Sequence, residues 1–202
     1  MMDSQQIVYV VEDDEAVRDS LEMMLVSMEY TVKTFPAANA FLDEYDESMA
    51  GCIVLDIRMP GMDGMELQKT LNTRHSILPI IFVTGHGDVP MAVEAMQQGA
   101  IDFIQKPYRE QELLEKIKAA LALDAEQRSS LIEKKEIQHK LDELTPREQE
   151  IMTMIVDGHA NKVIAIDLDI SQRTVEIHRS RVMHKMGTHS LAHLVRMIML
   201  VK

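Results

Sequence analysis

Residues 7–28 read IVYVVEDDEAVRDSLEMMLVSM, which is an apolar run, an acidic turn and an amphipathic segment in succession. An apolar run of this length is typical of a strand that is buried on both faces, and such strands belong to parallel sheets. The segment after the acidic turn has apolar residues at helical spacing. The stretch therefore predicts a strand followed by a helix, which is the repeating unit of an α/β sheet.

The same succession of a strand and a helix returns four more times. Further strands are expected at residues 31–35, 52–55, 79–84 and 102–105, and each is followed by an amphipathic segment. Strands that alternate with helices form βαβ units. The first part of the chain is therefore expected to be a doubly wound, five-stranded parallel sheet.

Helices alone are expected in the last part of the chain. Thr145 and Glu148 have the spacing of a capping box, and Pro146 stands in the first helical position between them. Three further helical segments follow, at residues 161–169, 171–186 and 190–201. A short helix, a tight turn and a longer helix with a polar face form a helix-turn-helix unit. The fold class is thus α/β followed by an all-α domain of four helices.

Residues 124–140 connect the two parts and contain charges of both signs without a strand signal. Such a segment is typical of a helical extension or a hinge. We therefore expect a domain over residues 1–123, a helical linker over 124–140 and a helix-turn-helix domain over 141–202.

Charge is distributed unevenly along the chain. The net charge is −12, and residues 1–123 account for it with 9 Lys and Arg against 21 Asp and Glu. Residues 141–202 are neutral in sum, with 8 basic against 8 acidic residues. Four basic residues nevertheless gather in one short stretch, at Arg173, Arg179, Arg181 and Lys185. This stretch could meet the phosphates of a nucleic acid.

The single cysteine, Cys52, opens an apolar strand and is interpreted as a small buried hydrophobe, so no disulfide framework is expected. The first residues have no basic region followed by an apolar stretch, and no run approaches the roughly 18 apolar residues of a membrane span. These features predict a soluble, cytoplasmic protein with no membrane partner.

Polar side chains stand where the expected strands end. Glu12 and Asp13 follow the first strand, Asp56 follows the third, Thr84 ends the fourth and Lys106 follows the fifth. In an open parallel sheet, ligands gather at the carboxyl ends of the strands. Three carboxylates, a hydroxyl and an ammonium are therefore expected in one crevice, which favours a metal-binding site that accepts a phosphoryl group.

Two sets of motifs carry a resemblance to known families. Residues 1–123 resemble the receiver domain of two-component response regulators, in VVEDDEAVR, VLDIRMPGMDG, VTGHGDVPMAVEAM and GAIDFIQKPY. Residues 144–200 resemble the LuxR/NarL-type helix-turn-helix, in LTPREQEI, ANKVIAIDLDISQRTVEIHRSRVMHKM and SLAHLVRM. The combination is similar to the FixJ-type branch and implies a flavodoxin-like receiver fold with a DNA-binding output domain.

The resemblance implies a role for the acidic residues. Asp56 would be the phosphoacceptor, because a carboxylate can act as a nucleophile and form an acyl phosphate. Glu12, Asp13, Asp56 and the main-chain carbonyl of Arg58 would hold Mg²⁺, which prefers oxygen ligands. Asp13 would be the more direct ligand, whereas Glu12 could act through a water. Asp14 would cap the following helix, although a ligand role for it stays open.

The resemblance also implies roles for the residues that surround the phosphoacceptor. Lys106 and Thr84 would bind phosphoryl oxygens, with the Lys106–Pro107 bond in the cis form. Phe103 occupies the position of a switch aromatic, but it could equally be a core residue of its strand. Arg58 and His86 occupy positions that tune the lifetime of the phosphate.

Two groups of DNA-contacting residues are implied in the output domain. Positions directed mostly at the DNA backbone are matched by Lys162, Thr174, His178 and Lys185. Candidates to face base edges are Glu176, Ile177, Ser180 and Arg181. Glu176 could accept from cytosine N4 or, alternatively, pair along the helix with Arg173 or Arg179. His189 and His193 are four residues apart, near His184, but zinc is disfavoured because no cysteine or second paired cluster accompanies them.

The expected function is a transcription factor that is switched by phosphorylation. A sensor histidine kinase would donate a phosphoryl group to Asp56, the receivers would pair, and the homodimer would bind double-stranded promoter DNA, with RNA polymerase as a further partner. Such a protein is a phosphoacceptor rather than an enzyme, with at most slow autophosphorylation and autodephosphorylation. Two alternatives are a phosphohydrolase that forms an aspartyl phosphate and a constitutive DNA-binding protein with a silent receiver. Arg58 disfavours the first, because it stands where a second catalytic acid would be expected.

Overall fold

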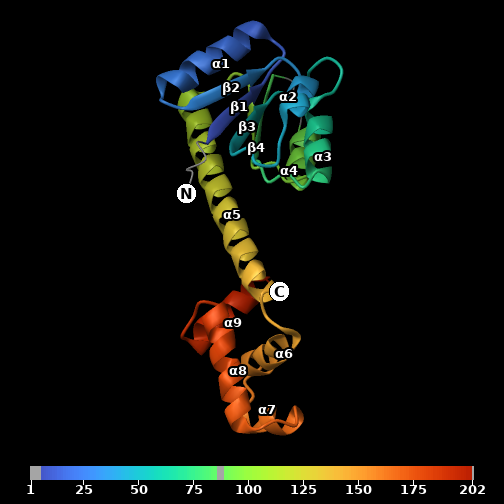
Figure 1. Ribbon diagram of the computed structural model, residues 1–202. Coiled ribbons are helices and arrows are strands. Elements are labelled where there is room, and N and C mark those ends of the chain that lie inside the picture. Colours follow the sequence, from blue (N-terminus) through green and yellow to red (C-terminus); the bar gives the residue numbers. More distant parts are fainter. Residues whose placement is uncertain (1–5, 86–88, 202) are drawn as a thin grey trace. The chain divides into compact units, whose positions relative to one another are not determined.

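The computed structural model describes residues 6–85 and 89–201, and the chain divides into two compact units, Met1–Arg128 and Ser129–Lys202 (Figure 1). None of the helices in these described ranges is both long enough and apolar enough to cross a bilayer.

A five-stranded parallel sheet forms the centre of the first unit (Figure 1). Its strands are β1 (Ile7–Val11), β2 (Thr31–Phe35), β3 (Gly51–Leu55), β4 (Ile80–Thr84) and β5 (Asp102–Gln105). Their order is β2-β1-β3-β4-β5. The chain winds in one direction from β1 and in the other from β3, so the carboxyl ends of these two strands flank the topological switch point. The predicted doubly wound sheet is confirmed.

Helices cover both faces of the sheet. They are α1 (Glu15–Ser27), α2 (Ala38–Glu44), α3 (Gly64–Thr73), α4 (Val89–Gln97) and α5 (Glu110–Asp142). Side chains alternate along each strand, so Val8 and Val10 pack with α1 and α5, whereas Tyr9 and Val11 pack with α2, α3 and α4. This two-sided burial explains why the strands read as unbroken apolar runs.

The loop between β1 and α1 is short and ends in a helix cap. The Asp14 carboxylate accepts a hydrogen bond from the Val17 amide at 3.1 Å. This side chain satisfies one of the amide groups that a helix start leaves without a partner. The predicted capping role of Asp14 is therefore confirmed.

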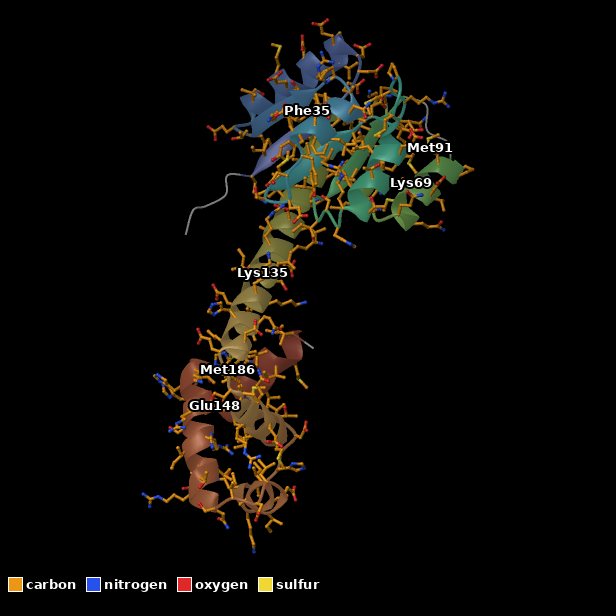
Figure 2. All side chains as sticks on the ribbon, turned by 45° about the vertical axis from the view of Figure 1, so that its right-hand side comes forward. Phe35, Lys69, Met91, Lys135, Glu148 and Met186 are labelled. Carbon is orange, nitrogen blue, oxygen red and sulfur yellow. The ribbon has the colours of Figure 1, made fainter. Side chains whose placement is uncertain are left out.

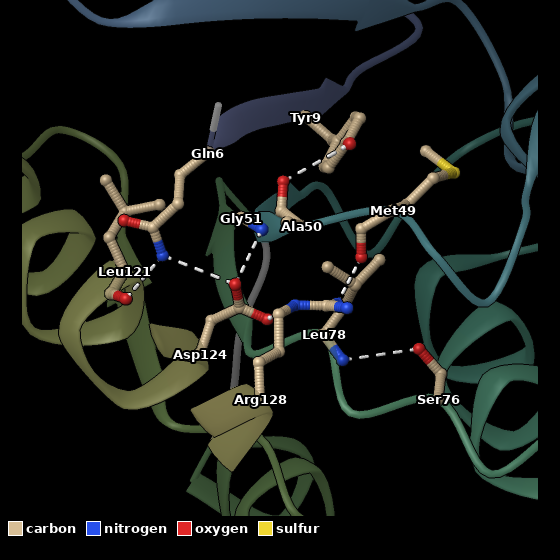
Figure 3. A network of polar contacts seen from close by, with 10 residues as sticks. All are labelled: Gln6, Tyr9, Met49, Ala50, Gly51, Ser76, Leu78, Leu121, Asp124 and Arg128. Carbon is tan, nitrogen blue, oxygen red and sulfur yellow. Dashed lines mark hydrogen bonds and ion pairs between the residues drawn. The ribbon is translucent and has the colours of Figure 1, made fainter. Parts of the chain in front are cut away.

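A network of polar contacts holds α5 against the amino ends of β1 and β3 (Figure 3). Asp124 is 0% exposed and accepts from the Gly51 amide at 2.9 Å and from the Arg128 Nε at 2.8 Å. Gln6 donates to Asp124 at 3.3 Å, and Arg128 also donates to the main-chain carbonyl of Met49. Residues that the sequence places at the start of the linker thus pack within the first unit.

Gly51 begins β3 in a conformation that excludes other residues. Its φ is +135°, and a Cβ at this position would lie 1.8 Å from the Ile7 carbonyl oxygen. Glycine is needed here because the backbones of β1 and β3 approach closely at a positive φ.

The second unit is helical. Besides the end of α5, it contains α6 (Pro146–Val156), α7 (Asn161–Asp167), α8 (Gln172–Lys185) and α9 (Leu191–Val201). Its apolar core gathers residues from all of these helices, and Met186, which is labelled in Figure 2, is fully buried in it. The four helices predicted after residue 141 are all present.

Candidate functional site

The register of the sheet brings the polar residues at the strand ends together. Val11 of β1 pairs with Leu55 of β3, and the Asp56 amide donates to the Val11 carbonyl at 2.9 Å. The residues that follow these two strands are consequently level with each other. Asp56 therefore lies beside Glu12 and Asp13, as expected from the strand pattern.

The three carboxylates are close enough to share a cation. One oxygen from each of Glu12, Asp13 and Asp56 lies within 4.8 Å of the other two. Glu12 is 3% exposed and Asp56 is 8% exposed, whereas Asp13 is open to solvent. Carboxylates at this separation repel one another, and hard divalent cations such as Mg²⁺ take oxygen ligands of this kind. The donor set therefore fits Mg²⁺.

Lys106 brings a positive charge to this cluster. Its Nζ lies 2.7 Å from the Glu12 carboxylate, and its amide donates to the Thr84 carbonyl at 2.8 Å. The Lys106–Pro107 bond is cis, as the resemblance implied. Thr84 ends β4 with 1% exposure, so the structure places both residues at the same edge as the carboxylates.

The environment of Glu12 disfavours its charged form. Burial raises the pKa of Glu12 above its ordinary value, and the charges of Asp56 and Asp13 add to the rise. The hydrogen bond and charge of Lys106 act in the opposite direction. A second positive charge at the cluster would therefore stabilise the ionised carboxylate.

Two residues near the cluster were not assigned a role from the sequence. The Arg18 guanidinium donates to the main-chain carbonyls of Glu12 at 2.9 Å and Asp13 at 3.3 Å. Gly64 packs so closely that a Cβ would lie 2.3 Å from the Asp56 carbonyl oxygen. Both residues stand inside the quoted motifs. Hydrophobic periodicity does not reveal them, because Arg18 bonds to main-chain atoms and Gly64 has no side chain.

The other predicted residues of this site differ in what surrounds them. Phe103 is half-buried and packs against the core, with its ring centroid 6.4 Å from that of Phe82. Such a contact is typical of a core residue. The switch role of Phe103 stays a prediction. The side chain of Arg58 is exposed. His86 lies outside the described residues.

Helix α8 presents one exposed face in the second unit. Val175 and Val182 are buried, so the opposite side of the helix faces outward. All four candidates for base edges lie on that side and are exposed, namely Glu176, Ile177, Ser180 and Arg181. Lys162 is exposed on α7, whereas Thr174 and His178 are half-buried.

Lys185, which was predicted to contact the DNA backbone, already has partners within the protein. Its Nζ lies 2.7 Å from the buried carboxylate of Glu148, which Figure 2 labels, and 3.0 Å from the Glu143 carbonyl. The side chain therefore joins the end of α8 to the start of α6, and its DNA contact stays a prediction.

The alternative ion pair of Glu176 is not formed. Arg179 donates to the Asn161 side chain at 3.3 Å instead, and within the described ranges neither Arg179 nor Arg173 forms an ion pair with Glu176. Glu176 is thus left exposed at the outer face of α8. Farther along the chain, His193 shares a hydrogen bond of 3.1 Å with the hydroxyl of Thr188.

Comparisons with protein families agree with this geometry. The family described as response regulator receiver domain matches residues 8–118. The family described as bacterial regulatory proteins, luxR family, matches residues 142–198. The two matches correspond to the sheet with its acidic cluster and to the helices around α8.

Curated relatives and solved structures match over nearly the whole length. The response regulator protein TodT of Pseudomonas putida is 42% identical over 97% of this chain and 86% of its own. The transcriptional regulatory protein FixJ of Azorhizobium caulinodans is 46% identical over 96% of this chain and 92% of its own.

Two solved structures are each 42% identical to this chain. The response regulator StyR matches with a TM-score of 0.88 over 96% of this chain and 98% of its own. FixJ from B. japonicum matches with a TM-score of 0.60 over 98% of both chains. The chain therefore belongs to the two-component response regulators of the FixJ type, transcription factors that join a receiver domain to a LuxR-family helix-turn-helix domain.

Proposed function

We propose that Asp56 accepts a phosphoryl group from a phosphohistidine of a sensor kinase and that this phosphorylation controls promoter binding through pairing of two copies. One observation carries the proposal. Three carboxylates from two neighbouring strands approach within 4.8 Å, with the ammonium of Lys106 beside them, in a chain that also has a helix-turn-helix domain.

The residues at the carboxyl edge would divide the chemistry among them. A carboxylate oxygen of Asp56 would attack the phosphorus, the bond from phosphorus to the histidine nitrogen would break, and an acyl phosphate would form. Glu12, Asp13, Asp56 and the Arg58 carbonyl would hold Mg²⁺, whose charge would offset the negative charge of the incoming group. Lys106 would share its ammonium between Glu12 and a phosphoryl oxygen.

The added charge would then change the receiver. Thr84 would turn toward a phosphoryl oxygen, and Phe103 would follow the movement of β5. Moving a two-state equilibrium from 1:99 to 99:1 requires about 5.5 kcal/mol of differential stabilisation. Contacts of the phosphoryl group and contacts between two receivers together would supply this free energy.

Helix α4 offers an apolar surface for such pairing. Val89 is 77% exposed, and Val93 and Met96 continue an apolar stripe at helical spacing. A stripe of this kind on a helix is typical of a surface that another protein covers. We propose a second receiver as the occupant, which would make the phosphorylated protein a homodimer.

Pairing would bring two DNA-binding domains onto one promoter. The exposed face of α8 would enter the major groove, with Glu176, Ile177, Ser180 and Arg181 toward base edges. Backbone-directed contacts would come from Lys162, Thr174, His178 and Lys185. RNA polymerase would be the further partner at the promoter. The domain limits of 1–123 and 141–202 with a linker at 124–140, and a cytoplasmic location, belong to this proposal.

The test uses the full-length protein with a small phosphodonor such as acetyl phosphate and Mg²⁺. Asp56→Asn is expected to abolish phosphoryl uptake on phosphate-affinity gels and the shift to dimer on size exclusion. Asp43→Asn, on the exposed part of α2, is the matched control and is expected to behave like the wild type.

Dimer formation by Asp56→Asn in response to the phosphodonor would show that the site is assigned wrongly. Equal promoter binding with and without the phosphodonor would favour the constitutive alternative. Rapid multiple turnover of small phosphate esters would favour the phosphohydrolase.

A further inference from the structure

Arg18 of α1 reaches back to the loop that carries the acidic pair. One nitrogen of its guanidinium donates to the main-chain carbonyl of Glu12 at 2.9 Å and to that of Asp13 at 3.3 Å. Neither bond involves a carboxylate oxygen. Arg18 therefore acts on the backbone of the two residues and occupies neither of their carboxylates.

The same loop is held from its other sides. The Glu12 amide donates to the Phe35 carbonyl of β2 at 3.1 Å, and the Asp14 carboxylate caps the Val17 amide at 3.1 Å. Glu12 is thus held through its amide by β2 and through its carbonyl by Arg18. Without Arg18, the Glu12 and Asp13 carbonyls would lose these hydrogen bonds to the protein.

The geometry points to Arg18 as a positioning residue of the phosphorylation site, which holds the main chain of Glu12 and Asp13 so that their carboxylates face Asp56 before a cation binds. This inference rests on the proposed function. The carboxylates of Glu12, Asp13 and Asp56 repel each other when no cation lies between them. An anchored loop resists that repulsion, so less free energy is spent on ordering the site when Mg²⁺ arrives.

A simpler role for Arg18 would be that of a countercharge to the acidic cluster. The two roles predict opposite effects on cation binding. A nearby positive charge disfavours a second cation, whereas an anchor favours it. Lysine separates them, because it keeps the charge but replaces the rigid, planar guanidinium with an ammonium on a more flexible stem, which holds the two carbonyls less firmly.

The experiment measures binding of Mg²⁺ alone to the full-length protein by isothermal titration calorimetry. Arg18→Lys is expected to weaken Mg²⁺ binding by about 3- to 10-fold, which is at or below the lower end of the loss seen when residues that orient metal ligands are changed. Thermal unfolding should stay within about 3 °C of the wild type. Arg74→Lys, at the end of α3, is the matched control and should bind Mg²⁺ like the wild type.

Arg18→Gln completes the comparison, since it removes the charge. If Arg18 were only a countercharge, Arg18→Lys would bind Mg²⁺ like the wild type and Arg18→Gln would bind it more tightly, and this result would overturn the inference. Weaker binding by both variants supports the anchor.

A second readout is the Mg²⁺ dependence of Asp56 phosphorylation by acetyl phosphate. Arg18→Lys should need about 3- to 10-fold more Mg²⁺, and saturating Mg²⁺ should restore the wild-type rate. A rate that stays low at saturating Mg²⁺ would overturn the positioning role. Failure of the wild type itself to bind Mg²⁺ would instead overturn the proposed function, so the two failures can be told apart.

Discussion

The two edges of the receiver sheet both contain buried carboxylates, but these carboxylates differ in the partners that surround them. At the amino edge, Asp124 accepts from the Gly51 amide, Gln6 and Arg128 (Figure 3). At the carboxyl edge, Glu12 and Asp56 are buried beside Asp13, and the ion pair in the described part of this site is the one between Lys106 and Glu12.

The difference separates Asp124, a carboxylate that stabilises the fold, from the acidic cluster, whose carboxylates are candidates for binding a ligand. Asp124 has donors on both oxygens, so its burial contributes to the stability of the fold. The acidic cluster has three carboxylates and one neighbouring ammonium. Further positive charge would therefore stabilise it. Groups that are incompletely paired in the resting protein are typical of sites that bind or react.

The strongest test of this comparison replaces one carboxylate at each edge. Asp124→Ala should lower the free energy of unfolding by about 2 to 4 kcal/mol, because it leaves the Gly51 amide without its partner and the half-buried Arg128 without its countercharge. Asp56→Ala should change it by less than about 1 kcal/mol, because the loss is offset by relief of repulsion. Urea unfolding of both variants measures the difference. Equal losses of stability would show that the two edges are not distinct in this way.

A further buried carboxylate, Glu148 in the second unit, extends the comparison. The hydrogen bond from Lys185, and after it that from the Thr145 amide, lowers the pKa of Glu148 from 4.5 to about 2. Because the folded-state pKa lies below the unfolded one, its contribution to stability is present above about pH 4.5 and is lost as the pH falls toward 2.

The expected cost of Glu148→Gln is about 2 kcal/mol near neutral pH, measured by urea unfolding. The difference from the wild type should shrink as the pH falls through this range. Glu150→Gln, on the exposed side of α6, is the control. A difference that does not depend on pH would mean that the ion pair with Lys185 contributes little.

Mg²⁺ should stabilise the receiver by binding at the carboxyl edge of the sheet and not at the amino edge. At a Mg²⁺ concentration ten times its dissociation constant, the free energy of unfolding of the receiver should rise by about 1.4 kcal/mol. Thermal unfolding with and without Mg²⁺ measures the rise, which should vanish in Asp56→Asn. The same rise in that variant would place the bound cation elsewhere on the protein.

The smallest effect is expected at Asp14, which adjoins the acidic pair. Asp14→Ala should lower stability by about 1 kcal/mol through loss of the helix cap while leaving Mg²⁺ affinity unchanged. Calorimetric titration of this variant checks the second part. A loss of affinity of about 10-fold or more would assign Asp14 to the cation instead.

Most of the fold could be predicted because its signals are local. Five apolar runs, the Asp14 cap and the capping box at Thr145 each depend on a few neighbouring residues. The candidate site followed from one further rule, that the carboxyl ends of neighbouring parallel strands meet. Asp56 and Asp13 could thus be placed together from the order of the strands.

Contacts between residues far apart in the sequence could not be predicted in this way. Asp124 and Gly51 are 73 residues apart, and nothing in the charged segment after residue 123 indicates that its first residue is fully buried. The same segment continues α5 as one helix to Asp142. Arg18 was overlooked for a different reason, since its acceptors are main-chain atoms that every residue possesses.

Gly51 places a limit on the sequences that can form this acidic cluster. It stands at the start of β3, and the Cβ of any other residue would collide with the Ile7 carbonyl at the start of β1. A side chain at residue 51 would therefore wedge apart the two strands whose other ends hold Asp13 and Asp56. The geometry of the acidic cluster thus depends on a residue that lies a full strand length away from it.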